Sequence, residues 1–151
     1  MASTLIYGFP YDKANHRRIG WGFGGRLPHK SVEFLEKQNF EGVIVNDYSD
    51  GAFLLHHLAP KIRPVMDSRI DVYGSELSHE YFSSRDDPLK FFQYLNKYNV
   101  AYILLMQTKK NIQVIQLLSQ LPASKLLLRA DDRFLFSYDP NLLPAEFLQH
   151  Q

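Results

Sequence analysis

The apolar positions of this chain fall into short runs that are separated by polar segments. Three of these runs are four to six residues long, which predicts strands at 42–46, 64–67 and 101–106. The run at 101–106 is apolar throughout, so we expect a central strand that is covered on both faces. Residues 125–129 and 133–138 flank an Ala-Asp-Asp turn and predict a C-terminal antiparallel hairpin.

Segments with apolar residues at helical spacing lie between the predicted strands. They predict helices at 31–37, 75–83 and 111–121. The segment 52–58 is ambiguous, and a two-turn helix that stops before Pro60 is one interpretation. Strands that alternate with helices predict an α/β fold, here a single-domain sandwich with a mixed, mostly parallel sheet flanked by helices.

The clearest helix signal starts at Asp87. An aspartate is a favourable cap, and Pro88 takes the first helical position, where its missing N–H is not needed. Leu89, Phe92 and Leu95 then share one face. We therefore expect the α/β domain to span 28–140, after an extended lead-in over 1–27 that is a candidate juxtamembrane segment and before a tail over 141–151.

Composition narrows the classes of function. The chain has 151 residues, 45% of them hydrophobic and 22% charged, which suits one domain with a core. Its 17 basic and 16 acidic residues give no basic excess, which disfavours nucleic-acid binding. The absence of cysteine excludes disulfides, Cys-ligated zinc and a cysteine nucleophile. No stretch of the sequence approaches the length of a transmembrane helix.

Polar residues are densest between the predicted strands at 42–46 and 64–67 and just after them. Asp67, Arg69 and Asp71 alternate, so on an extended chain their side chains would share one face and form a carboxylate–guanidinium network. A structural ion network is the favoured interpretation and a catalytic role is the alternative.

A second polar group follows the strand at 42–46. Asn46, Asp47 and Asp50 would join the Asp67 group at adjacent strand ends, where α/β sheets bind ligands. Gly51 supplies a permissive backbone for the turn after Tyr48. Because several oxygens would converge, a divalent cation is the one candidate cofactor, and otherwise we expect none.

The segment 46–74 resembles the extracytoplasmic C-terminal domain of bacterial GT-C-type multi-spanning membrane glycosyltransferase-like proteins. The resemblance covers 28–140 by order of elements, and its specific residues are Asn46, Tyr48, Gly51, Leu54-Leu55, Pro60-Lys61, Asp67-Ser-Arg69 and Asp71-Val-Tyr73-Gly74. Two positions depart from the family pattern, since Ala52 and Ser68 stand where glycine is common. Residues 46–51 also resemble, more loosely, the Trp-Trp-Asp-Tyr-Gly motif of oligosaccharyltransferase catalytic subunits. They lack the tryptophans of that motif, which argues against a peptide-acceptor role.

The resemblance implies an accessory domain on the periplasmic side of the bacterial inner membrane. Its partners would be the transmembrane part of its own full-length chain and a lipid-linked sugar or acceptor. Because the catalytic acids of such enzymes lie in membrane-side loops, the domain alone would be inactive, with no catalytic or metal-ligating residue of its own. It would cap the membrane cavity or help to place the acceptor. The alternatives are a free-standing metal-dependent enzyme or ligand-binding protein using Asp47, Asp67 and Asp71, and a protein-interaction module.

The lead-in contains an aromatic, glycine-rich segment. Residues 20–25 fit the Gly-x-Gly-x-x-Gly fingerprint formally, but residues 16–19 make a poor preceding strand, so we interpret the segment as a loop. Trp21 and Phe23, beside Arg17 and Arg18, are candidates for contact with a bilayer interface. Packing of Trp21 onto the domain is an equal alternative.

Overall fold

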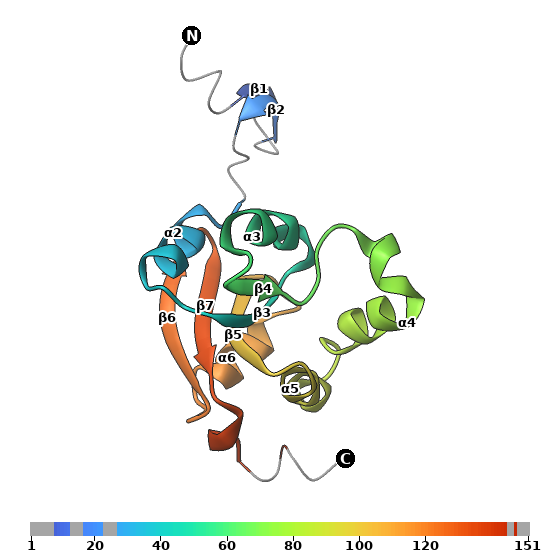
Figure 1. The fold of residues 1–151 in the computed structure, drawn as a ribbon, viewed down its shortest axis with the longest axis vertical. Helices are drawn as coiled ribbons and strands as arrows, with labels where there is room; N and C mark the ends of the chain where they lie inside the picture. Colours follow the sequence, from blue (N-terminus) through green and yellow to red (C-terminus); the bar gives the residue numbers. More distant parts are fainter. Residues whose placement is uncertain (1–7, 13–16, 23–26, 145–146, 148–151) are drawn as a thin grey trace.

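A computed structural model of the protein describes residues 8–12, 17–22, 27–144 and 147. Its main sheet has five strands in the order β4-β3-β5-β7-β6 (Figure 1). The strands are β3 (Gly42–Asn46), β4 (Ile62–Pro64), β5 (Val100–Met106), β6 (Ser124–Ala130) and β7 (Arg133–Tyr138). The helices are α2 (His29–Lys37), α3 (Gly51–Leu58), α4 (Ile70–Ser83), α5 (Pro88–Lys97) and α6 (Ile112–Leu118), with 3₁₀ turns η1 (Tyr48–Asp50) and η2 (Pro140–Leu142).

The strand directions confirm the predicted α/β fold with a mixed sheet. β3 pairs in parallel with β4 on one side and with β5 on the other. β7 pairs antiparallel with β5 and with β6. The parallel core therefore comes from the strand–helix repeat, and the C-terminal hairpin extends it. As predicted from its apolar sequence, β5 is the central strand.

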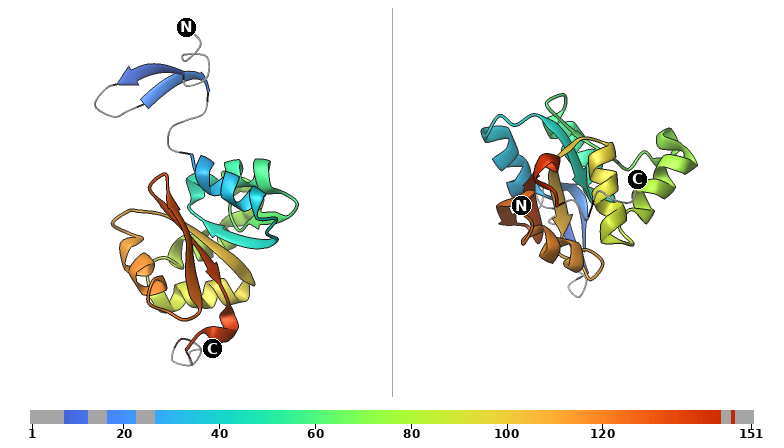
Figure 2. Two further views of the ribbon diagram at one scale, coloured as in Figure 1. Left: turned by 90° about the vertical axis from the view of Figure 1, so that its left-hand side faces the viewer. Right: turned by 90° about the horizontal axis from the view of Figure 1, so that it is seen from below.

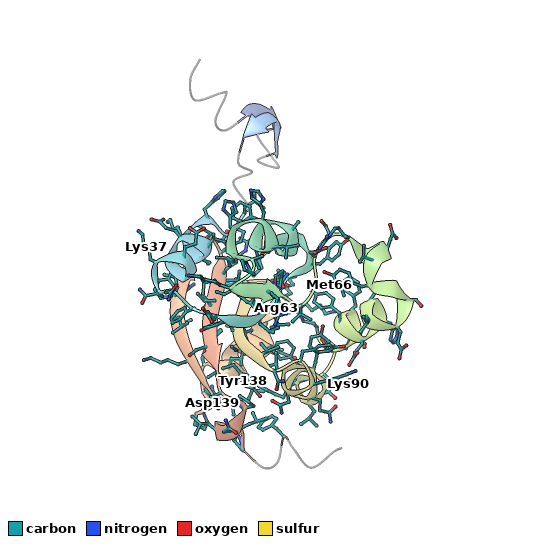
Figure 3. All side chains as sticks on the ribbon, viewed as in Figure 1. Lys37, Arg63, Met66, Lys90, Tyr138 and Asp139 are labelled. Carbon is teal, nitrogen blue, oxygen red and sulfur yellow. The ribbon has the colours of Figure 1, made fainter. Side chains whose placement is uncertain are left out.

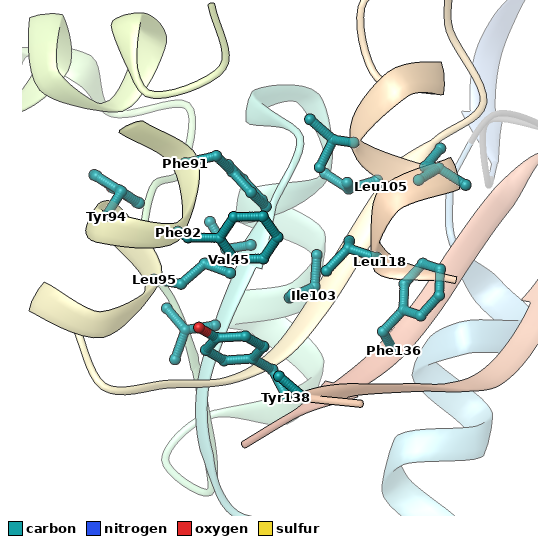
Figure 4. Packing of buried hydrophobic residues seen from close by; sticks show 14 of the residues in the cluster. Val45, Phe91, Phe92, Tyr94, Leu95, Ile103, Leu105, Leu118, Phe136 and Tyr138 are labelled. Atoms are coloured by element: carbon teal, nitrogen blue, oxygen red, sulfur yellow. The ribbon is translucent and has the colours of Figure 1, made fainter. Parts of the chain in front are cut away.

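Helices cover both faces of this sheet (Figure 2). On one face, α2 and α3 pack against alternate strand residues, including Ile44 and Leu104. On the other face, α5 and α6 pack against Val45, Ile103 and Leu105 (Figure 4). Neighbouring residues of β3 and β5 thus face opposite layers, as the twofold alternation of side chains along a strand requires. The burial on both sides explains why these strands are apolar throughout.

The predicted helices at 31–37, 52–58 and after Asp87 are confirmed as α2, α3 and α5. The side chain of Asp87 accepts a hydrogen bond from the backbone N–H of Leu89 at 2.9 Å, with Pro88 in the first helical turn. Phe92 and Leu95 are buried as predicted. The helix predicted at 111–121 is shorter, because α6 ends at Leu118.

The strand predicted in the central segment is misplaced, and the helix predicted after it is confirmed as part of a longer element. The strand expected at 64–67 is β4, which lies earlier and ends at Pro64. Met66 is buried in the loop that follows, on the side of the sheet toward α4, so its burial does not require a strand (Figure 3). The helix predicted at 75–83 is confirmed as the second part of α4, whose unpredicted first turn starts at Ile70 and which is interrupted at Gly74 with φ 73° and ψ 170°.

The lead-in contains a two-stranded antiparallel sheet, formed by β1 (Gly8–Asp12) and β2 (Arg17–Gly22). The interpretation of residues 16–19 as a poor strand is therefore wrong for 17–19, because backbone pairing in a hairpin requires no apolar alternation. The side chains of Arg17, Arg18 and Trp21 lie outside the described part of the structure, and Phe23 lies outside the described residues.

Candidate functional site

The polar residues after β3 lie at the carboxyl ends of β3 and β5. From β3 the chain crosses through α3 to β4 on one side, and from β4 it crosses through α4 and α5 to β5 on the other side. The two strand ends therefore flank a topological switch point, the usual position of ligand sites in open α/β sheets. This position makes the region the candidate functional site.

Asp47 is the centre of a hydrogen-bonded cluster between these strand ends. Its Oδ1 accepts from Nη1 of Arg85 at 2.8 Å and from Nδ2 of Asn111 at 3.1 Å. Its Oδ2 accepts from the backbone N–H of Met106 at 2.5 Å. The carboxylate thus joins β3 to the end of β5, to the loop before α5 and to the residue before α6. Because both of its oxygens already have protein donors, its geometry is that of a structural link.

Asn46 extends this cluster into the interior. Its buried side chain donates from Nδ2 to the carbonyl oxygen of Met66 at 2.9 Å, which holds the loop after β4 beside the end of β3. Its own carbonyl oxygen accepts from the Tyr81 hydroxyl at 2.6 Å and from Nη2 of Arg85 at 2.5 Å. Burial raises the pKa of Tyr81 to about 12, so its hydroxyl remains a donor at neutral pH. Asn46 and Asp47 therefore tie α4 and the loop before α5 to the sheet.

Asp50 belongs to a separate pair. Its two carboxylate oxygens accept from Nε and Nη2 of Arg133, both at 2.6 Å, in a bidentate arrangement. Both side chains are almost completely buried. Burial raises the pKa of Asp50, and the adjacent guanidinium opposes that rise. Nη1 of Arg133 also donates to the carbonyl oxygen of Asp131 at 2.7 Å, so the pair connects η1 to the hairpin turn between β6 and β7.

The Asp50–Arg133 pair lies in the wall of a pocket of about 640 Å³. The pocket opens beside the carboxyl end of β5 and the β6–β7 turn. Its lining consists of Leu27, Ser49, Asp50, Met106, Gln107, Asp131, Asp132 and Arg133. A pocket of this volume is within the range of small-molecule sites.

Asp67 and Arg69 pair with each other in the loop before α4. Nη2 of Arg69 donates to Oδ2 of Asp67 at 2.6 Å, and the Arg69 backbone N–H donates to Oδ1 at 2.8 Å. These hydrogen bonds lower the pKa of Asp67 to about 2. The Tyr48 hydroxyl donates to the carbonyl oxygen of Ser68 at 3.0 Å and fixes the same loop. The predicted Asp67–Arg69 contact is therefore present.

The predicted alternation of Asp67, Arg69 and Asp71 on one strand face is wrong. Arg69 precedes α4, and Asp71 is exposed in its first turn, so the three residues do not form an extended segment. The half-buried Tyr73 belongs to the same helix, and burial raises the pKa of its hydroxyl. The expected single cluster of Asn46, Asp47, Asp50 and Asp67 is instead divided among three different arginines.

The two motif glycines have distinct roles. Gly51 has ordinary helical angles, so the prediction that it supplies a permissive turn is wrong. It is needed for close packing, because a Cβ at this position would lie 2.1 Å from the carbonyl oxygen of Met66 and 2.6 Å from Cα of Asp67. Gly74 has a different role. A Cβ at this position would meet no neighbouring group within 4 Å, so space is not the constraint, but its φ of 73° disfavours residues other than glycine.

Sequence reasoning missed the three partners of Asp47 and Asp50 that lie far from 46–74, namely Arg85, Asn111 and Arg133. Arg133 was predictable as a buried, paired residue. In a strand it shares a face with Leu135, and a charge at a core-facing position requires a buried partner. Arg85 and Asn111 lie in polar segments that precede helices, and their residue types there do not indicate burial.

Among the described residues, no group of three or more His, Cys, Asp or Glu side chains is placed to hold a metal ion. Each helix in the described part of the chain is too short or too polar to cross a bilayer. No protein-family model matches the chain, and comparisons with curated proteins and with solved structures find no match.

Proposed function

We propose that this chain is a non-catalytic accessory domain of a GT-C-like membrane glycosyltransferase, with the periplasmic location that the resemblance implies. The observation that carries this proposal is the use of the motif residues in internal contacts. Asp47 is matched by Arg85 and Asn111, and Asp67 by Arg69. A catalytic carboxylate needs an oxygen that is free to face substrate, whereas the carboxylates of Asp47 and Asp67 accept hydrogen bonds that hold loops in place.

The role that fits this arrangement is to present a rigid surface to the membrane-embedded part of the same protein. Hydrogen bonds from Asn46 and Tyr48 hold the loop at 66–69, and the Asp47 cluster holds the loops at the ends of β3 and β5. Loops fixed in this way would keep their shape when they cap a cavity or help to place an acceptor. Lipid-linked sugar and acceptor are then partners of the whole protein.

Native size and location test this proposal. An antibody against the domain is used to blot membrane and soluble fractions of the source cells. We expect a band much larger than 17.6 kDa, the mass of this chain, in the membrane fraction after a carbonate wash. Protease should degrade the epitope in spheroplasts and leave it intact in whole cells. A soluble band near 17.6 kDa would contradict the proposal.

A protein-interaction module is the second candidate, and the surface of α4 favours it. Val72, Leu77 and Phe82 are large apolar residues on this helix with exposed side chains, and the exposed fraction reaches 72% at Val72. Large apolar side chains left exposed on one element are a feature of interaction surfaces. Sedimentation that depends on protein concentration would support this candidate, and a monomer at every concentration would count against self-association.

A further inference from the structure

The pocket beside the β6–β7 turn has a lining that combines several kinds of hydrogen-bonding group. Ser49 contributes an exposed hydroxyl beside Asp50. Gln107 contributes an exposed amide, whose Oε1 accepts from Nη2 of Arg129 at 3.4 Å and whose NH₂ group can donate. Asp132 contributes an exposed carboxylate, which only accepts. Leu27 and Met106 contribute apolar surface. Polar groups that converge on a partly apolar pocket are typical of a small-molecule site.

The charges of the lining limit the ligand. Asp50 and Arg133 neutralise each other within their buried pair. Asp131 already accepts from the backbone N–H of Lys30 through Oδ2 at 2.8 Å, beside the start of α2. The lining holds three carboxylates and one guanidinium, and Arg129, which contacts Gln107, adds a second guanidinium beside it, so the formal charge remains negative. An anionic ligand would be repelled, and a ligand that supplies hydrogen-bond donors would be favoured.

The backbone at the switch point does not suit a phosphate group. In dinucleotide-binding folds, a glycine-rich turn lets the backbone approach the pyrophosphate at a helix N-terminus. Here the first residue of α3 is Gly51, and the space that its missing side chain leaves is filled by the backbone of Met66 and Asp67. The acidic Asp50 directly precedes this helix. Both features disfavour the binding of a nucleotide in the pocket.

We propose that this pocket binds a neutral polyhydroxylated ligand the size of a mono- or disaccharide. Sugar hydroxyls both donate and accept, which matches a lining with a carboxylate, a hydroxyl and an amide. The C–H faces of a sugar ring match Leu27 and Met106. The volume of about 640 Å³ accommodates such a ligand. This proposal concerns the domain alone, so it stands or falls separately from the membrane-protein proposal.

The test uses the complete 151-residue chain, labelled with ¹⁵N, and follows its amide resonances. Glucose, galactose, mannose and N-acetylglucosamine are titrated separately to about 50 mM, a range suited to weak small-ligand binding. We expect at least one neutral sugar to shift the amides of Ser49, Gln107 and Asp132 in a saturable way. Glucose 6-phosphate serves as the anionic probe and should bind more weakly than glucose.

Variants locate the binding. Ser49→Ala combined with Gln107→Ala removes two exposed hydrogen-bonding groups and should weaken the affinity about tenfold. Asp132→Asn keeps a residue type that tolerates its φ of 58° and removes the charged acceptor, with a similar expected loss. Asp71→Asn, an equivalent change at the exposed start of α4, should leave the affinity unchanged.

Three outcomes would overturn the proposal. The first is the absence of saturable shifts at the pocket with every neutral sugar. The second is tighter binding of glucose 6-phosphate than of glucose, because it would contradict the charge argument. The third is an equal loss of affinity in Asp71→Asn and Asp132→Asn. A spectrum of each variant without ligand identifies any variant that has lost its fold, and the remaining variants then decide.

Discussion

Single residues at the ends of β3 and β5 satisfy two physical requirements at once. Burial of a charge is costly unless a partner of opposite charge compensates it, and the buried Asp50 and Arg133 provide this compensation for each other. Asp47 provides it for Arg85. The same side chains connect segments that lie far apart in the sequence. We therefore expect substitutions here to affect folding stability before they affect any binding surface.

Arg133→Met tests the buried pair. The substitution leaves Asp50 buried without its partner, so we expect the free energy of unfolding to fall by about 3–5 kcal/mol at neutral pH. Burial already raises the pKa of Asp50, and without the guanidinium that pKa rises further. The folded state then binds a proton more readily than the unfolded state, so the deficit should shrink as the pH falls toward about 5. Urea unfolding at both pH values measures this.

A double variant is the control for Arg133→Met. Asp50→Asn combined with Arg133→Met removes both charges, so it should be more stable than Arg133→Met alone at neutral pH. Its stability should also depend less on pH over the same range. A double variant less stable than the single one at neutral pH would mean that the ionic charge of Asp50 is not the source of the cost.

Gly51→Ala tests close packing between α3 and the loop after β4. The new Cβ would lie 2.1 Å from the carbonyl oxygen of Met66, and backbone cannot move away as easily as a flexible side chain. We expect a loss of about 3 kcal/mol or more in the free energy of unfolding. Ala52→Ser changes the exposed neighbouring position and should cost less than about 0.5 kcal/mol. Similar stabilities of the two variants would contradict the packing argument.

Elements differ in how completely their own sequence specifies them. The helix α5 and the strand β5 were predicted correctly because an Asp-Pro start and an unbroken apolar run are local signals. The strand β4 was predicted too late in the chain because Met66 is buried although it lies in a loop. The helix predicted at 75–83 is the part of α4 after Gly74, and the turn from Ile70 that precedes Gly74 was not predicted. Tertiary packing of Met66 therefore explains the misplaced strand.

The start of α5 offers a prediction at this scale. Asp87→Ala removes the side-chain acceptor of the Leu89 N–H, so the free energy of unfolding should fall by about 1 kcal/mol. Asp86→Ala changes the preceding aspartate, whose side chain is exposed and pairs with Lys110 on the surface. That substitution should cost less than about 0.5 kcal/mol. Equal costs in chemical denaturation would show that general surface charge, rather than capping, accounts for the effect.

The candidate site illustrates what pattern alone leaves open for the whole molecule. Asn46, Asp47, Tyr48 and Asp67 were singled out by their density near a strand end, and the fold brings them to one edge of the sheet. Arg85 and Asn111, the partners of Asp47, come from the loops before α5 and α6, and Arg133, the partner of Asp50, comes from the start of β7. Such pairings depend on long-range topology, which local periodicity does not encode. The sequence therefore indicated where the polar residues meet, but it did not predict that their carboxylates pair with separate arginines.

That division carries a prediction about metal ions. A divalent cation needs several oxygen ligands that converge, and Asp47 and Asp67 each face an arginine, while Asp71 is exposed on α4. Binding to the folded state alone would raise the melting temperature by mass action. We therefore expect millimolar magnesium, manganese or calcium to leave the melting temperature unchanged within about 1 °C. Thermal unfolding with each chloride salt, against sodium chloride at equal ionic strength, measures this.

A rise in the melting temperature with one cation and not with the others would contradict this expectation and support the hypothesis of a metal-dependent enzyme. Asp47→Asn and Asp71→Asn then separate the sources of such a rise, because a shared site would lose it in both variants. An ion held by the pocket carboxylates would instead be lost only in Asp132→Asn, since Asp132 lines the pocket and Asp47 and Asp71 do not. The same three proteins thus distinguish a catalytic cation at the predicted motif from one in the pocket.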